Sequence, residues 1–277
     1  MNKISAAITA IGAYVPDYIL SNQLLETMVD TNDEWITTRT GIKERRILKD
    51  KDKGTSYLAI KAAQNLIDKK NINPSEIDMV IVATATPDMM VASTAAFVAT
   101  QVGAKNAFSY DLQAACSSFL YGMSTAASYI ESGRYKKVLL IGADKMSSII
   151  DYEDRTTCII FGDGAGAALF EPNNEGLGFQ DEYLRSDGNG REFLRMDAGG
   201  SLFPASEDTV KNKQKQLNQD ETAYKKAQDT FVANQKAAVS KAKEKTDSES
   251  VLVKLNKEIE ELPNRVEIAL KDKLNFD

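Results

Sequence analysis

Two runs of bulky apolar residues do most to limit what this chain can fold into. They are "MVIVA" within "PSEIDMVIVATATPD" and "VLLIGA" within "YKKVLLIGAD". Neither run alternates with polar residues, which is typical of strands buried on both faces of a sheet. Stretches with apolar residues at helical spacing lie between and around them. Buried strands that alternate with helices predict a layered α/β fold.

The remaining segments of the first two hundred residues fit the same scheme. "AITAIGAYVP" and "NAFSYDLQAA" are expected to be extended, and "TSYLAIKAAQNLIDKK", "STAAFVATQVGA" and "CSSFLYGMSTAASYIESG" to be helical. Gly103 and Gly133 stand where the second and third of these helices should end, because glycine tolerates the left-handed backbone of a C-terminal cap.

The composition changes after Ser201. All 16 glycines lie between Gly12 and Gly200, and residues 205–277 carry 14 Lys and Arg against 14 Asp and Glu. A charged stretch without glycine is typical of exposed helices or a coiled coil. Its heptad pattern is short and Pro263 interrupts it, which favours an amphipathic or partly disordered tail over a coiled coil.

Charge and cysteine content exclude several classes of protein. The net charge is −6 and the pI is near 5.0, so there is no basic surface for nucleic acid or for an anionic membrane. Two cysteines are too few for a disulfide framework and fit a reducing cytoplasm. The apolar N-terminal stretch "ISAAITAIGAYV" is better explained as a first strand than as a signal peptide, and nothing is long enough to span a bilayer.

Cys116 stands where an expected strand ends and an expected helix begins, in "DLQAACSSFLYG". Free N–H groups and the helix dipole at such a junction stabilise a thiolate, and small neighbours leave room for a substrate. Most free cysteines are nevertheless unreactive core residues. The residues alone therefore leave both interpretations open.

Several long motifs resemble one enzyme family. "DLQAACSSFLYGM", "VDTNDEWITTRTGIKERR", "VIVATATPD" and "DRTTCIIFGDGAGAALFE" resemble, in order and spacing, β-ketoacyl-[acyl carrier protein] synthase III, a condensing enzyme of the thiolase superfamily. The resemblance covers residues 1 to about 208. It implies a thiolase-like N-terminal half over 1–172, an irregular start of the second half over 173–208, and, in place of the rest, a helical or partly disordered tail over 209–277.

The resemblance also implies roles for individual residues. Cys116 would be the nucleophile that takes an acyl group from coenzyme A, which is a substrate, so no bound cofactor or metal is expected. Trp35 and Arg155 resemble the pair that sandwiches the adenine, and Thr31 and Arg39 resemble its neighbours. Taken alone, a single tryptophan is more often core, and an arginine within "DYEDR" is more often part of a surface ion pair.

"FGDGAGAALFE" raises a rival hypothesis. Gly162, Gly164 and Ala167 fit the loose pattern of a dinucleotide-binding turn, which would indicate an NAD-linked oxidoreductase. That turn must open a helix, whereas this segment reaches Pro172 too soon and is expected to be a strand. Cys158, inside the apolar "TTCIIF", is expected to be core.

Part of the family's machinery is missing. Family members deliver a histidine and an asparagine from their second half to support malonyl decarboxylation, and this sequence has no histidine. Losing one such group costs about 10²–10⁴ in rate. Two hypotheses follow: a cytoplasmic, homodimeric acyltransferase of fatty acid synthesis that uses acetyl-CoA and malonyl-[acyl carrier protein], with doubtful decarboxylation, or a non-catalytic acyl-CoA-binding remnant or assembly module. A half without its partner is also expected to leave one sheet face bare.

Overall fold

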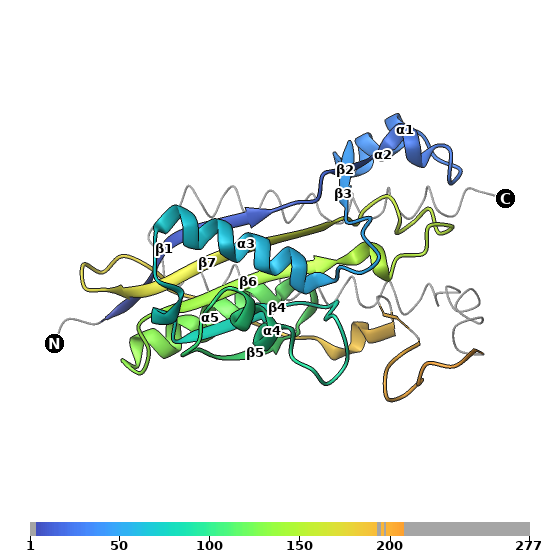
Figure 1. Ribbon diagram of the computed structural model, residues 1–277. Helices are drawn as coiled ribbons and strands as arrows, with labels where there is room; N and C mark the ends of the chain where they lie inside the picture. Colours follow the sequence, from blue (N-terminus) through green and yellow to red (C-terminus); the bar gives the residue numbers. More distant parts are fainter. Residues whose placement is uncertain (1–3, 193–194, 197, 208–277) are drawn as a thin grey trace. The chain divides into compact units, whose positions relative to one another are not determined.

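The structure is a computed structural model that describes residues 4–192, 195–196 and 198–207. Its centre is a five-stranded sheet in the order β1-β7-β6-β4-β5 (Figure 1). β4 pairs in parallel with both β5 and β6, whereas β7 runs antiparallel to both β6 and β1. The strands are β1 (Ser5–Tyr14), β4 (Met79–Ala83), β5 (Phe108–Leu112), β6 (Val138–Lys145) and β7 (Asp163–Asn173).

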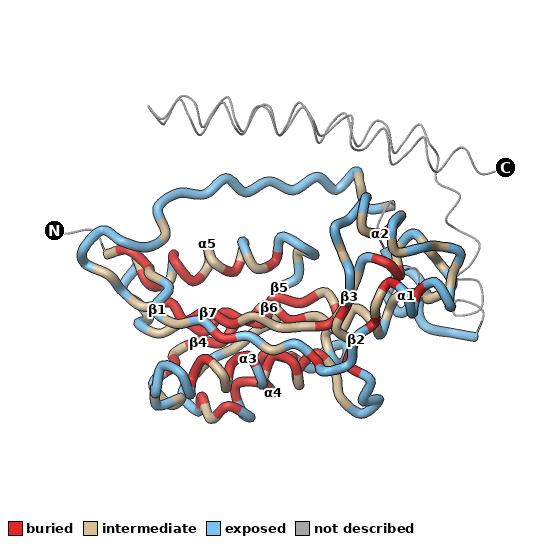
Figure 2. The backbone as a smooth tube through the Cα atoms, turned by 90° about the horizontal axis from the view of Figure 1, so that it is seen from above, coloured by how far each residue is buried: buried red, intermediate tan, exposed pale blue. Residues whose placement is uncertain are grey.

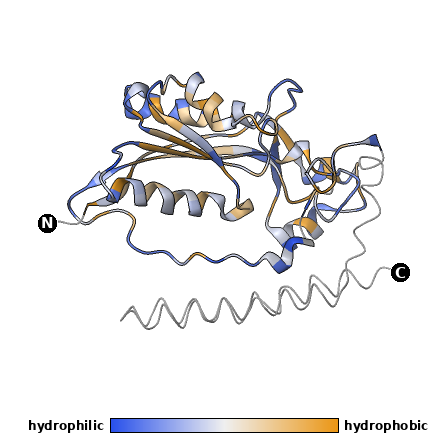
Figure 3. Ribbon diagram, turned by 90° about the horizontal axis from the view of Figure 1, so that it is seen from below, coloured by the Kyte–Doolittle hydropathy of each residue, from blue (hydrophilic) through white to orange (hydrophobic). Residues whose placement is uncertain are grey.

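Helices of the same unit cover both faces of this sheet (Figure 2). α3 (Thr55–Lys70) and α4 (Thr94–Gln101) pack on one face, and α5 (Ser118–Glu131) packs on the other. Alternate residues of β4 serve the two cores: Val80 and Val82 face α3 and α4, while Met79 and Ile81 face α5. This is why the strand sequences are continuously apolar. Figure 3 shows the hydrophobic colouring concentrated along the strands.

The sequence predicted these elements closely, with two corrections. α4 and α5 end just before Gly103 (φ 82°) and Gly133 (φ 72°), as expected. The third helix begins at Ser118 rather than Cys116, because a 3-10 turn, η2 (Ala115–Ser117), precedes it. The prediction of a bare sheet face holds only in part, since α5 buries Ala126, Ala127 and Ile130 against the sheet while Ile8 and Ile11 of β1 stay 47% and 68% exposed.

A smaller lobe stands at one end of the sheet. It consists of the hairpin β2 (Tyr18–Ser21) and β3 (Glu44–Ile47) with helices α1 (Asn22–Leu25) and α2 (Asp33–Thr40) between its strands. Its core includes residues from the segment 149–162, which joins the 3-10 turn η3 (Met146–Ser148) to β7. The remaining short turns are η1 (Pro74–Glu76) and η4 (Gly188–Glu192).

The chain divides into two compact units, Met1–Glu182 and Tyr183–Asp277, and every element described above except η4 belongs to the first. The expected boundaries at 172 and 208 stay predictions. The expected helical tail over 209–277 lies outside the described residues. Among the helices that are described, none combines the length and apolar character needed to cross a membrane.

Candidate active site

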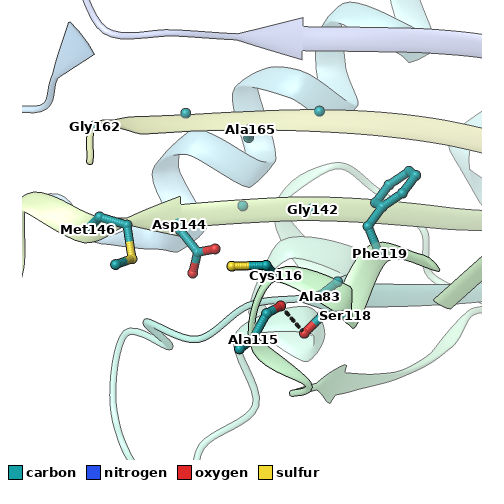
Figure 4. A pocket seen from close by; sticks show the side chains of 13 residues that line it. Ala83, Ala115, Cys116, Ser118, Phe119, Gly142, Asp144, Met146, Gly162 and Ala165 are labelled. Carbon is teal, nitrogen blue, oxygen red and sulfur yellow. Dashed lines mark hydrogen bonds between the residues drawn. The ribbon is translucent and has the colours of Figure 1, made fainter. Parts of the chain in front are cut away.

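Cys116 lies in η2, between the carboxyl end of β5 and the start of α5, and its side chain is exposed. It faces a pocket of about 340 Å³, and Figure 4 shows its sulfur pointing into that pocket on the side where Asp144 lies. The sequence-based placement of Cys116 at a strand–helix junction is therefore confirmed. The pocket is lined by Ala83, Ala115, Cys116, Ser118, Phe119, Gly142, Ala143, Asp144, Met146, Gly162, Gly164, Ala165 and Gly166.

The backbone before Cys116 is strained. Ala115 has φ 49°, a left-handed conformation that costs an L-residue about 1–2 kcal/mol. The side chain of Ser118 holds this turn: its hydroxyl accepts from the N–H of Ala114 at 2.6 Å and donates to the carbonyl of Ala115 at 2.7 Å. Strain of this kind persists where the surroundings fix it, and it clusters at functional sites.

The amino end of α5 offers donors beside the sulfur. α5 has 14 residues, and its N-cap, Ser117, makes no side-chain cap hydrogen bond. Within the described part of the chain, the N–H of Cys116 has no backbone or side-chain acceptor. Unpaired N–H groups and the positive end of the dipole favour an anionic oxygen at this position.

The opposite wall of the pocket consists of small residues of β6 and β7. "DGAGAALFE" is part of β7, so the segment opens no helix and the rejection of a dinucleotide-binding turn is confirmed. Gly162, Gly164 and Gly166 all line the pocket. Buried Asp163 holds the start of β7, because its carboxylate accepts from the N–H groups of Leu48 and Ser147, both at 2.8 Å.

Sequence reasoning missed Asp144 and Gly142 at the end of β6. Oδ1 of Asp144 accepts from the hydroxyl of Thr84 at 3.0 Å and from the N–H of Ala85 at 2.8 Å, which fixes the pocket wall after β4. A lone glycine within "VLLIGAD" was the available signal for Gly142, since a Cβ there would meet the ring of Phe119 at 3.0 Å. Nothing in the sequence singled out Asp144.

A second cluster forms around Trp35 on α2. The guanidinium carbons of Arg39 and Arg155 lie 4.4 Å and 5.1 Å from the centre of its rings. Arg155 also donates to the carbonyl of Asp30 at 2.9 Å and lies 3.6 Å from its carboxylate. The structure thus brings Trp35, Arg39 and Arg155 together. Trp35 is partly core, since it packs against the lobe's buried residues.

Thr31 stands just before α2, and its hydroxyl is buried without a hydrogen-bond partner in the described part of the chain. Buried polar atoms in proteins almost always have partners, so an orphan of this kind suggests that a ligand supplies one. Arg155 belongs to the segment 149–162, whose last residue, Gly162, lines the Cys116 pocket. One segment therefore joins the tryptophan cluster to the pocket.

Cys158 has the opposite character from Cys116. It is fully buried in the core of the small lobe, and burial raises the pKa of its thiol. A neutral buried thiol is a poor nucleophile. The prediction that Cys158 is a core residue is confirmed.

Comparisons with known proteins agree on one family. Residues 110–188 match the family model described as 3-oxoacyl-[acyl-carrier-protein (ACP)] synthase III. The chain is 57% identical over 228 residues to β-ketoacyl-[acyl-carrier-protein] synthase III 2 of Bacteroides thetaiotaomicron, an overlap of 82% of this chain and 68% of that one. It is 58% identical over 219 residues to the synthase III of Chlorobaculum tepidum, covering 78% of this chain and 67% of that one.

Solved structures show the same likeness. The synthase III of Thermus thermophilus superposes with a TM-score of 0.66 at 43% identity, over 73% of this chain and 61% of that one. The synthase III of Aquifex aeolicus superposes with a TM-score of 0.58 at 48% identity, over 60% of this chain and 53% of that one. The chain thus spans about two thirds of the curated relatives' length and between half and two thirds of the length of these solved structures.

Proposed function

Because the chain belongs to the β-ketoacyl-[acyl-carrier-protein] synthase III family, a family of condensing acyltransferases, we propose that Cys116 accepts an acetyl-like acyl group from a coenzyme A thioester. The observation that carries this proposal is the exposed Cys116 sulfur at the amino end of α5, facing a pocket walled by small residues. The fully buried Cys158 offers no comparable nucleophile.

The transfer is a thioester exchange. The thiolate of Cys116 attacks the carbonyl carbon, a new carbon–sulfur bond forms, and the bond to coenzyme A breaks. Coenzyme A leaves as a thiolate and takes up the proton that Cys116 gave away. In the tetrahedral intermediate the carbonyl oxygen carries negative charge, and the unpaired N–H of Cys116 is a donor that suits it. One such donor is worth about 10²–10³ in rate.

We assign the nucleotide end of coenzyme A to the cluster around Trp35. An indole face flanked by the guanidinium planes of Arg39 and Arg155 suits a stacked adenine and nearby phosphates. The unpartnered hydroxyl of Thr31 supports the same assignment. Coenzyme A enters and leaves as a substrate in this scheme, and no bound cofactor takes part.

The second half-reaction needs more than these residues provide. In the family, malonyl-[acyl carrier protein] loses carbon dioxide and its carbanion takes the acyl group, which begins fatty acid synthesis. These 277 residues contain no histidine to support the decarboxylation. We therefore propose that they carry out acyl transfer to Cys116 and perform condensation poorly.

We further propose a homodimer in the cytoplasm. β5 is an edge strand whose residues are partly exposed, and Phe108, Tyr129 and Tyr135 form an aromatic cluster beside it. A second copy would cover such an edge. The two unpaired cysteines fit a reducing compartment.

The missing histidine also favours a second candidate, a non-catalytic protein that binds acyl-CoA or assembles through its tail. Incubation with acetyl-CoA separates the two candidates. The enzyme hypothesis expects one acetyl group on the peptide that contains Cys116, none on the Cys158 peptide, and none in the Cys116→Ser variant. A folded protein that binds acetyl-CoA without labelling would support the binding protein. Product formation from malonyl-[acyl carrier protein] at the rate of complete family members would contradict the weak condensation proposed here.

A further inference from the structure

A buried arginine without a carboxylate partner lies in the small lobe, which also carries the tryptophan cluster. Arg45 on β3 is 4% exposed, and in the described part of the chain it forms no ion pair. Its Nε donates to the carbonyl of Ile159 at 2.8 Å, its Nη2 bonds the same oxygen, and its Nη1 bonds the side-chain oxygen of Asn22. The guanidinium therefore joins β3, α1 and the segment 149–162.

Asn22 continues this connection to α2. It is 0% exposed, and its Nδ2 donates to the carboxylate of Asp33 at 2.6 Å and to the carbonyl of Ile42 at 2.8 Å. Asp33 and Thr37 share a hydrogen bond on α2, the helix that carries Trp35. Through its bond to Asp33, Asn22 thus fixes the position of α2, the helix that carries Trp35.

The other end of the connection is Ile159. It belongs to the segment that carries Arg155, and it is buried together with Ile36 of α2. A continuous chain of hydrogen bonds, partly buried at α2 and fully buried at Arg45, therefore runs from α2 through Asn22 and Arg45 to the segment of Arg155. This chain links the two structural elements whose side chains face each other across the cluster.

Stability alone does not explain this arrangement. Burial lowers the pKa of Arg45, which means that the protein destabilises the charge it keeps there. Well-packed apolar residues often serve at least as well as buried charges. The planar guanidinium of Arg45 bonds two defined acceptors, on Asn22 and Ile159, and so fixes the distance between them. Apolar packing does not fix a distance in this way.

We propose that Asn22 and Arg45 are positioning residues that set the separation of Trp35 and Arg155 for the nucleotide end of an acyl-CoA. The inference rests on the proposed function. It assigns these two residues to substrate affinity rather than to the chemistry at Cys116.

The test uses the 277-residue chain and its single tryptophan, Trp35. Quenching of Trp35 fluorescence measures the Kd for coenzyme A in the Arg45→Met and Arg45→Lys variants. Arg46→Met is the matched control, because its guanidinium is on the same strand but partly exposed and bonds Glu44 and Pro16. Circular dichroism and thermal unfolding establish folding of each variant.

A second readout separates positioning from general damage. Acetyl-CoA and acetyl-pantetheine present the same thioester, but only acetyl-CoA carries the nucleotide. We expect Arg45→Met to raise the Kd for coenzyme A about tenfold, within the range of desolvated cation–π contacts. The Arg45→Met substitution should slow the labelling of Cys116 at low concentrations of acetyl-CoA. Labelling at saturating acetyl-CoA, and labelling by acetyl-pantetheine, should stay unchanged. Arg45→Lys should lie between, and Arg46→Met should match the original chain.

An unchanged Kd in folded Arg45→Met would overturn the inference, and so would equal slowing with both thioesters. If Arg45→Met does not fold, Arg45→Lys decides, and an original Kd in that variant overturns the inference. Should the unaltered chain fail to bind coenzyme A at all, the proposed function itself fails and the inference with it. That outcome is distinct because it appears before any substitution.

Discussion

Ser118 and Ala114 close a short ring of hydrogen bonds around Cys116. The hydroxyl of Ser118 accepts from the N–H of Ala114 at 2.6 Å and donates to the carbonyl of Ala115 at 2.7 Å. The sulfur is thereby carried on a turn fixed from both sides, on a side chain that stays exposed. Geometry, rather than burial, therefore sets the position of the proposed nucleophile.

Ser118→Ala should weaken that turn. It leaves the partly buried N–H of Ala114 without its acceptor, and the loss of one hydrogen bond costs about 0.5–1.5 kcal/mol. We expect a lower free energy of unfolding in urea and slower labelling of Cys116 by acetyl-CoA. Ser117→Ala is the control, because that neighbouring side chain is exposed and makes no cap hydrogen bond. Equal effects of the two substitutions would contradict the account.

Substitutions of Ala115 test the backbone strain just before Cys116. Its φ of 49° suits glycine and penalises a β-branched residue. Ala115→Gly should leave the free energy of unfolding unchanged or raise it by up to about 1 kcal/mol, and Ala115→Val should lower it by more than about 1 kcal/mol. Urea denaturation of both variants measures this. A more stable Ala115→Val variant would mean that the left-handed turn does not form.

Arg155 tests the coenzyme A assignment. Arg155→Gln removes one guanidinium from the face of Trp35, so coenzyme A should quench Trp35 fluorescence with a Kd raised about threefold to tenfold. Added salt should weaken binding to the original chain more than to this variant, since one cation is lost. Arg134→Gln, at an exposed position just after α5, should change neither the Kd for coenzyme A nor its dependence on salt. Identical titrations for all three proteins would exclude Arg155 from the site.

Cys158 makes a prediction about alkaline pH. Burial raises the pKa of its thiol in the folded protein, so the unfolded chain loses this proton first. The stability that the protonated Cys158 thiol contributes is therefore fully present below the pKa of the thiol in the unfolded chain, about 8.5. It is lost as pH rises through the pKa of the thiol in the folded protein. Between about pH 7 and pH 10, Cys158→Ala should lose less unfolding free energy than the original chain. Parallel losses would show that Cys158 titrates normally.

The strands and helices of the first half could be read from the sequence because burial on both faces leaves a direct signature. Met79 to Ala83 are all buried, and the corresponding run is wholly apolar. The position of Cys116 followed from the same pattern. The 3-10 turn before α5 could not be predicted, because the Ala115 conformation depends on a hydrogen bond from Ser118 that local propensity does not encode.

Arg45 and Asp144, which support the two candidate binding regions, could not be predicted from the sequence either. Arg45 seemed to be one of several charged residues in "GIKERR", and only the packed lobe shows that it is buried and bonded to Ile159, 114 positions away. Asp144 likewise acts through Thr84, 60 positions away. Contacts at such separations leave no local periodicity, whereas Trp35 and Arg155 could be proposed because they belong to long recognisable motifs.

Acyl transfer to Cys116 is tested most directly by comparing coenzyme A release with acetylation of Cys116 in a single turnover. We expect one equivalent of free coenzyme A thiol for each acetyl group found on the Cys116 peptide, and neither product in Cys116→Ser. Coenzyme A released without acetylation of Cys116, or no release from a folded protein that binds acetyl-CoA, would contradict this expectation.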